Sequence, residues 1–270
     1  MLPGESNLEI RTVLPPRANG NGGKPPLLFV HGGYCDAWCW TPYFLPWFAA
    51  RGYASHALSL RGHGASAGRE TIFVAGLDDF AADVLSVAST LPSPPVLIGH
   101  SMGAAVIERL LLSHPVRAAA LISPVPPAGV LPMAARLAAE QPDYLMRLLQ
   151  FDPARLTAHV LDVLRPYYFS PDVAPQILFQ ATKHLCAESP RALLDLSLRL
   201  HWQLPQSNDV PLFVLGAEGD RVSTPADVKA TARHHGVEAT IVPGLAHMLM
   251  LEGQWETAAR ELARWLATIK

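Results

Sequence analysis

The segment Gly99-His100-Ser101-Met102-Gly103 constrains the fold of this chain more than any other part of its sequence. It has the spacing Gly-x-Ser-x-Gly, follows the apolar run 95–100 and opens a helical pattern over residues 101–113. In a sharp turn from a strand into a helix, a serine hydroxyl projects above the sheet, and glycines two residues before and after it prevent side-chain collisions. The context of the motif therefore predicts such a turn, with Ser101 as candidate nucleophile.

Short apolar runs elsewhere predict further strands that helices bury on both faces. The predicted strands are residues 26–31, 53–60, 95–100, 118–123, 210–216 and 238–242, and residues 7–13 alternate like an antiparallel edge strand. Helical patterns follow at residues 77–91, 101–113, 225–235 and 252–269. This alternation predicts an α/β fold, a mostly parallel sheet flanked by helices and joined by right-handed crossovers.

The alternation of strands and helices fails once, between Pro124 and Pro205. This stretch has only helical patterns, at residues 133–140, 153–164, 171–184 and 190–200. It is too long for an ordinary crossover between neighbouring strands. We therefore expect residues 125–205 to form an inserted helical cap, or lid, over a core domain built from residues 1–124 and 206–270.

Composition limits the class of protein and its partners. Of the 270 residues, 50% are apolar and 16% are charged, which fits one large domain with a sizeable core. The net charge of -2 offers no basic field for nucleic acid. The first residues lack the apolar region of a signal peptide, and no apolar run could cross a bilayer. We expect a cytoplasmic protein that binds a small-molecule substrate and neither nucleic acid nor membrane; a homodimer is compatible with the sequence.

The three cysteines, Cys35, Cys39 and Cys186, do not predict a disulfide framework, because their number is odd. Cys35 and Cys39 lie four residues apart, but His31 is the only obvious third ligand near them. A structural zinc site normally has four protein ligands, so this set is one ligand short. The sequence thus favours free thiols and predicts neither a metal nor a cofactor.

A serine hydroxyl becomes a good nucleophile only when a base removes its proton. Of the 11 histidines, His247 follows the last predicted strand and precedes the final helix, at the sheet edge where the nucleophile should lie. His234 and His235 are expected to be exposed on a helix, and Glu108 is expected on the outer side of its own helix. His247 is therefore the predicted base.

Such a base needs a carboxylate to fix its tautomer. The negative charge that develops on the substrate carbonyl oxygen needs backbone amides as hydrogen-bond donors. Asp220 follows the preceding predicted strand and is the predicted acid, with Glu218 as the alternative. The amides of Met102, which follows the nucleophile, and of Gly33, in the glycine pair after the first core strand, are the predicted oxyanion donors.

These motifs together resemble the α/β-hydrolase superfamily: residues 31–33 (HGG), 61–64 (RGHG) and 99–103 (GHSMG), with Asp220 and His247 following in the order of that family. Residues 31–40 (HGGYCDAWCW) and 247–251 (HMLML) are also similar to the plant methylesterase and hydroxynitrile lyase group. The lyases carry a lysine directly after the histidine, whereas Met248 stands here. The resemblance implies ester hydrolysis rather than cyanohydrin cleavage, and a supporting rather than catalytic role for His63. We expect His31 and His100 to pack and to brace loops rather than to act in catalysis.

The predicted function is hydrolysis of a carboxylic ester of a small-to-medium hydrophobic substrate through an acyl-enzyme. Tyr34, Trp38 and Met248 are the residues expected to line the substrate pocket. Three alternatives use the same residues: a carbon–carbon bond hydrolase, a cofactor-free dioxygenase with His247 as base, and a non-catalytic small-molecule receptor.

Overall fold

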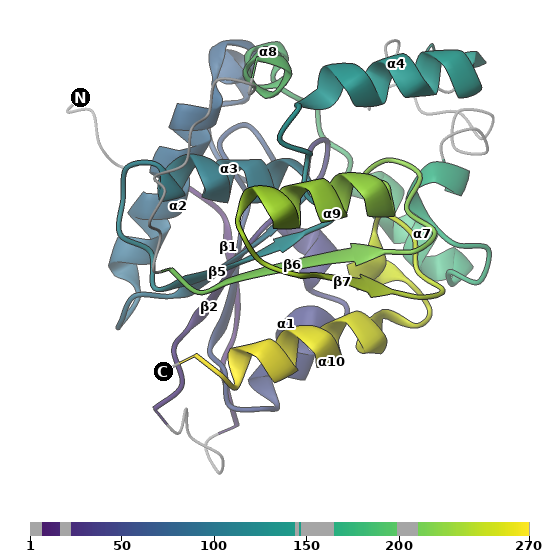
Figure 1. Ribbon diagram of the computed structural model, residues 1–270. Coiled ribbons are helices and arrows are strands. Elements are labelled where there is room, and N and C mark those ends of the chain that lie inside the picture. The colour runs from purple at the N-terminus through teal and green to yellow at the C-terminus, as the bar shows by residue number, and fades with distance from the viewer. Residues whose placement is uncertain (1–6, 17–22, 144–145, 147–164, 199–209, 270) are drawn as a thin grey trace.

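The computed structural model describes residues 7–16, 23–143, 146, 165–198 and 210–269 (Figure 1). Its centre is a seven-stranded sheet in the order β1-β3-β2-β4-β5-β6-β7. The strands are β1 (Ile10–Val13), β2 (Leu27–Val30), β3 (Ser55–Leu58), β4 (Val96–His100), β5 (Ala118–Ile122), β6 (Leu212–Ala217) and β7 (Ala239–Val242). Only β1 pairs antiparallel, with β3, and the other pairs are parallel. The predicted fold class and the antiparallel edge strand are confirmed.

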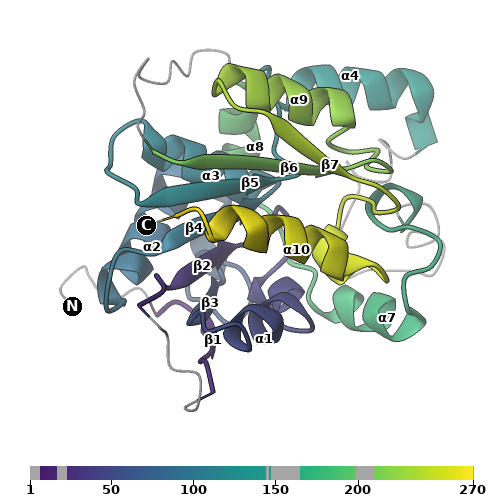
Figure 2. The ribbon, with the colours of Figure 1, turned by 60° about the horizontal axis from the view of Figure 1, so that its bottom comes forward.

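Helices cover both faces of the sheet, which is why the central strands are apolar throughout. On one face lie α2 (Leu77–Thr90), α3 (Met102–Leu111) and α9 (Pro225–His234), and on the other α1 (Phe44–Ala49) and α10 (Trp255–Leu266) (Figure 2). Successive residues of a strand face opposite sides, so Leu28 and Val30 join the core under α2, α3 and α9. Leu27 and Phe29 join the core under α1 and α10.

Between β5 and β6, the described residues form helices and no strand: α4 (Val130–Glu140), α7 (Pro175–Lys183) and α8 (Pro190–Ser197). Figure 1 shows α7 at the end of the sheet to which the arrows of β6 and β7 point, and α4 above α9, extending towards the same end. The helix expected at residues 153–164 lies outside the described residues. The division into a cap of residues 125–205 and a two-part core stays a prediction.

One buried Glu–His pair contradicts two expectations about exposure. Glu108 on α3 and His235 at the end of α9 were expected to face solvent, but both side chains are 1% exposed and their Oε1 and Nε2 atoms lie 2.9 Å apart. The periodicity of α3 shows which face meets the sheet. It does not show that the end of α9 packs against another side of α3 and encloses both groups.

Short 3-10 helices shape the loops near the carboxyl end of the sheet. In η1 (Ala37–Trp40), the Asp36 side chain accepts a hydrogen bond from the Trp38 amide and so caps the helix. A second one, η5 (Leu249–Leu251), precedes α10, so the last helix begins later than its sequence pattern predicts. Of the helices that the structure describes, none is both long enough and apolar enough to cross a bilayer.

Candidate active site

Ser101 lies in the turn from β4 into α3. Its backbone has φ 51° and ψ -115°, a conformation that residues other than glycine rarely adopt. The turn requires its two glycines, because the chain is very close to itself there. A Cβ on Gly99 would lie 2.4 Å from the Gly103 carbonyl oxygen, and one on Gly103 would lie 2.4 Å from the His31 carbonyl oxygen. The Ser101 amide donates to the Ile122 carbonyl of β5 at 2.9 Å, which fixes the turn to the sheet.

His247 and Asp220 form a buried pair on neighbouring loops, after β7 and β6. His247 Nδ1 and Asp220 Oδ2 are 2.8 Å apart, and both residues are 3% exposed. Asp220 Oδ1 accepts from the Val222 and Ser223 amides at 2.8 Å each, so the carboxylate is fixed as an acceptor. His247 therefore carries its proton on Nδ1 in the neutral state and leaves Nε2 as a proton acceptor. Glu218, the alternative acid, is exposed.

His100 connects the His247 loop to the serine turn. Its Nε2 donates to the His247 carbonyl oxygen at 2.9 Å, and the two rings lie 4.7 Å apart between centroids. Burial, together with the nearby His247, lowers the pKa of His100 well below its ordinary value, so the ring is neutral. Among the described residues, no hydrogen bond joins the Ser101 hydroxyl directly to His247.

The glycine loop, residues 32–36, follows β2 and packs directly on the serine turn. A Cβ on Gly32 would lie 2.7 Å from His100 Nδ1 and 3.1 Å from Ser101 Cβ. Gly33 follows in this loop, and Met102 is the first residue of α3. Amides in the first turn of a helix have no partner within the helix and point towards its N-terminal end. The two predicted oxyanion donors thus belong to neighbouring segments beside Ser101.

His31 holds the glycine loop to the end of β3. Its Nδ1 donates to the Gly32 carbonyl at 2.8 Å, and its Nε2 accepts from the Leu60 amide at 3.0 Å. Complete burial and the neighbouring His63 lower the pKa of His31 to about 3. A neutral ring with one donor and one acceptor suits both bonds. The supporting roles expected of His31 and His100 agree with these contacts.

The predicted pocket residues are near this site but in different surroundings. Tyr34 lies in the glycine loop with φ 60°, and Trp38 stacks on His184 with ring centroids 4.6 Å apart. Met248 is buried, and its amide donates to the Tyr168 carbonyl at 2.8 Å. The Tyr168 ring meets the His247 ring edge-on at 5.7 Å. Sequence reasoning missed Tyr168, because no motif marks it.

Metal ligands do not gather in the described part of the chain, where no three of the His, Cys, Asp and Glu side chains form a group that could hold an ion. All three cysteines are free thiols. Burial raises the pKa of Cys186 to about 11 and that of Cys35 further, so both keep their protons at neutral pH.

The profile of the alpha/beta hydrolase family matches residues 27–265, which cover both loops of the His247–Asp220 pair, the serine turn and the glycine loop. The chain therefore belongs to the alpha/beta hydrolase family.

Among individual proteins, a pyrethroid hydrolase from Sphingobium wenxiniae is 29% identical over 140 residues. The match spans 52% of this chain and 46% of that protein, so it covers less than half of the relative. An esterase from Exiguobacterium antarcticum has a TM-score of 0.74 at 16% identity, covering 97% of this chain and 96% of its own. An enol-lactonase from Burkholderia xenovorans LB400 has a TM-score of 0.70 at 17% identity, covering 96% of both chains. These two structures share the fold.

Proposed function

We propose that this protein is a serine hydrolase that cleaves carboxylic esters of small-to-medium hydrophobic substrates through an acyl-enzyme. The observation that carries the proposal is the His247–Asp220 pair at 2.8 Å, which His100 links to the strained turn that carries Ser101. Family membership supports a hydrolase, and the name of the pyrethroid hydrolase relative supports hydrolysis of an ester.

In the proposed mechanism, His247 Nε2 takes the proton of the Ser101 hydroxyl as its oxygen attacks the ester carbonyl. The amides of Gly33 and Met102 donate to the oxyanion, and the imidazolium then protonates the leaving alcohol. Water repeats the sequence on the acyl-enzyme and releases the acid. Asp220 holds the Nδ1 proton throughout and stabilises the imidazolium. Acidification slows the reaction because a protonated imidazole cannot accept the serine proton.

The test is a panel of p-nitrophenyl esters from acetate to octanoate, with lactones and diketones beside them. We expect the wild-type protein to hydrolyse one or more esters, and Ser101→Ala to lower the rate by at least about 10³-fold. A fluorophosphonate should attach to Ser101, as read by mass spectrometry of the peptide that contains it.

Other outcomes of the same panel contradict the proposal in distinguishable ways. Turnover that survives Ser101→Ala but not His247→Ala indicates base catalysis without an acyl-enzyme, as in a cofactor-free dioxygenase. Cleavage of diketones without ester turnover indicates a carbon–carbon bond hydrolase. Failure of Ser101 to react, together with tight binding of a small molecule, indicates a receptor.

A further inference from the structure

A connecting segment, residues 184–189, joins α7 to α8 and lies against the glycine loop. It makes hydrogen bonds to both backbone groups of Tyr34. The Cys186 amide donates to the Tyr34 carbonyl at 2.8 Å, and the Tyr34 amide donates to Glu188 Oε2 at 3.0 Å. The connecting segment therefore fixes the residue that follows Gly33, the proposed oxyanion donor.

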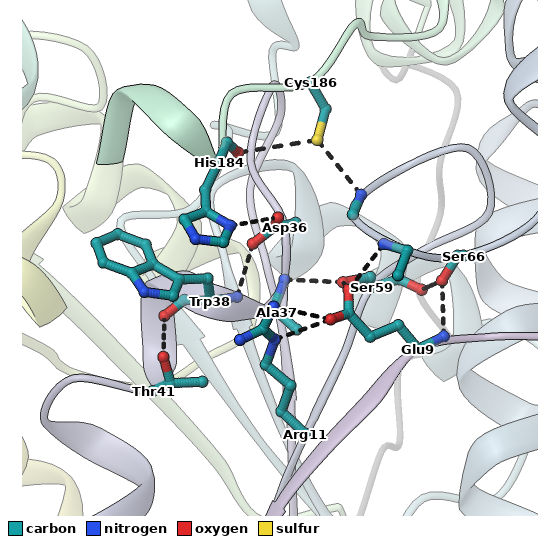
Figure 3. Close-up of polar contacts among 12 residues, drawn as sticks. Glu9, Arg11, Asp36, Ala37, Trp38, Thr41, Ser59, Ser66, His184 and Cys186 are labelled. Atoms are coloured by element: carbon teal, nitrogen blue, oxygen red, sulfur yellow. Dashed lines mark hydrogen bonds and ion pairs between the residues drawn. The ribbon is translucent and has the colours of Figure 1, made fainter. Parts of the chain in front are cut away.

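A second set of contacts holds the other end of the glycine loop (Figure 3). His184 Nδ1 and Asp36 Oδ2 are 2.8 Å apart, and Asp36 Oδ1 accepts from the Trp38 amide at 2.7 Å. Cys186 Sγ accepts from the Gly64 amide at 3.3 Å. The glycine loop is thus fastened to the connecting segment on both sides of Cys35.

Glu188 is itself held by a buried histidine. The side chains of Glu188 and His63 are both 0% exposed, and Oε2 and Nε2 are 3.3 Å apart. His63 Nδ1 is 3.0 Å from the Arg61 carbonyl, which only accepts, so Nδ1 carries a proton. Glu188 Oε2 also accepts from Tyr34, and Oε1 accepts from the Ser189 amide at 2.7 Å. A carboxylate facing an imidazolium satisfies all of these contacts.

We propose that Glu188, held in place by His63, is a positioning residue that keeps the glycine loop in the conformation in which the Gly33 amide meets the substrate oxyanion. This inference rests on the proposed function. Tyr34 has φ 60°, a conformation that a residue with a side chain adopts at a cost, and the Glu188 hydrogen bond stabilises it. Glu188 Oε2 also lies 3.3 Å from the place of a Cβ on Gly33, so the carboxylate packs directly on this residue.

The positive charge of His63 matters for catalysis as well, because it balances the Glu188 carboxylate close to the proposed oxyanion site. Burial disfavours the charged ring, but the Glu188 carboxylate, together with the Arg61 carbonyl and Asp36, outweighs burial and raises the pKa of His63 above its ordinary value. Other titratable groups around the pair are His31, Tyr34, Cys35, Asp36 and Cys186. When His63 loses its proton at alkaline pH, an unpaired carboxylate remains beside the place where the oxyanion forms. Turnover should then decrease.

The first experiment measures the loop without using activity. Hydrogen–deuterium exchange is followed in the peptide that contains Tyr34, in wild type, Glu188→Gln and the control Glu108→Gln. In Glu188→Gln, either orientation of the new side-chain amide places its NH₂ group against a backbone N–H, of Tyr34 or of Ser189. We expect about tenfold faster exchange of the Tyr34 amide in Glu188→Gln. Glu108→Gln changes another buried Glu–His pair, between α3 and α9, and should leave that rate unchanged.

The second experiment uses the best ester substrate across the pH range. Glu188→Gln should lower kcat by about ten- to hundredfold with KM within about threefold, somewhat less than the loss of a whole oxyanion donor. We expect kcat to decrease at alkaline pH in wild type and in Glu108→Gln, and we expect no such decrease in Glu188→Gln. Glu188→Asp, which keeps the charge but falls short of Tyr34, should lower kcat and retain the alkaline decrease.

Wild-type exchange and a wild-type kcat profile in Glu188→Gln would overturn the proposal, as would a change confined to KM. If Glu188→Gln does not fold, Glu188→Asp decides by the same two readouts. If the wild-type protein hydrolyses no ester, the proposed function fails. The exchange rates still show, in that case, whether Glu188 holds the glycine loop.

Discussion

Asp220 shows how two acidic residues close together in the chain acquire different roles. It accepts from two backbone amides and faces His247 Nδ1, whereas Glu218 is exposed. In Asp220→Asn, an Asn that keeps its oxygen on the two amides turns its NH₂ towards His247 and forces the wrong tautomer. We expect kcat to fall by about 10⁴-fold with the fold intact. Steady-state ester kinetics and circular dichroism measure both quantities.

The matched control for this substitution is Glu218→Gln, which should retain wild-type kcat. A large loss in Glu218→Gln together with a mild one in Asp220→Asn would reverse the assignment of the acid. Equal and small effects of both would argue against an acid of this kind.

At the level of single residues, sequence order and position were enough to select the pair that the structure brings together, Asp220 and His247. Each lies just after a predicted strand, and the ends of parallel strands meet at one edge of a sheet. Glu188 and Tyr168 could not be predicted. Their positions depend on how the chain between β5 and β6 returns over the sheet, and no local pattern encodes that path.

At the level of elements, the close contact between α3 and β2 requires a glycine at position 103. A Cβ at Gly103 would lie 2.4 Å from the His31 carbonyl and 2.5 Å from the Val30 carbonyl, both of them backbone atoms that cannot turn away. Gly103→Ala must therefore shift the helix and the serine turn with it. We expect a loss of about 1–3 kcal/mol in the free energy of unfolding by urea, together with loss of activity.

Gly253→Ala is the comparison for this substitution, since its Cβ would come only to 3.2 Å from the Asp172 side chain at an exposed position. We expect it to change stability by less than Gly103→Ala. If Gly103→Ala were as stable and as active as Gly253→Ala, the close packing of α3 on β2 would not be essential.

The strands were predictable as elements because continuous apolar runs bounded by loops are typical of strands that are buried on both faces. The surroundings of a helix were harder to predict. The sequence of α3 indicates the face that packs on the sheet, but Glu108 is enclosed by a helix that arrives from more than a hundred residues later, at His235. The 3-10 helices η1 and η5 have no periodicity long enough to detect.

For the molecule as a whole, buried neutral histidines should make stability depend on pH. The pKa of His31 is about 3 in the folded protein, against about 6.5 for an unfolded chain. Below pH 6.5 the unfolded state binds a proton that the folded state does not, so stability is present above that pH and decreases as the pH falls towards 3. We expect a loss of about 2 kcal/mol from this residue between pH 7 and pH 5.

Urea unfolding at the two pH values measures this loss. His31→Gln should weaken the dependence on pH, whereas His114→Gln, at an exposed position, should leave it as in wild type. An unchanged dependence in His31→Gln would show that the ring is protonated, or accessible to protons, in the folded protein.

The attachment of residues 184–189 to the glycine loop has a consequence for building chimaeras from members of this family. A donor module inserted between β5 and β6 to change substrate preference would bring its own sequence at these positions. Without counterparts of His184, Cys186 and Glu188, the recipient would keep its serine, aspartate and histidine. It would lose the hydrogen bonds that hold the glycine loop at Tyr34 and Asp36. We therefore expect chimaeras that retain residues 184–189 of the recipient to keep catalytic activity, and those that replace these residues to lose it.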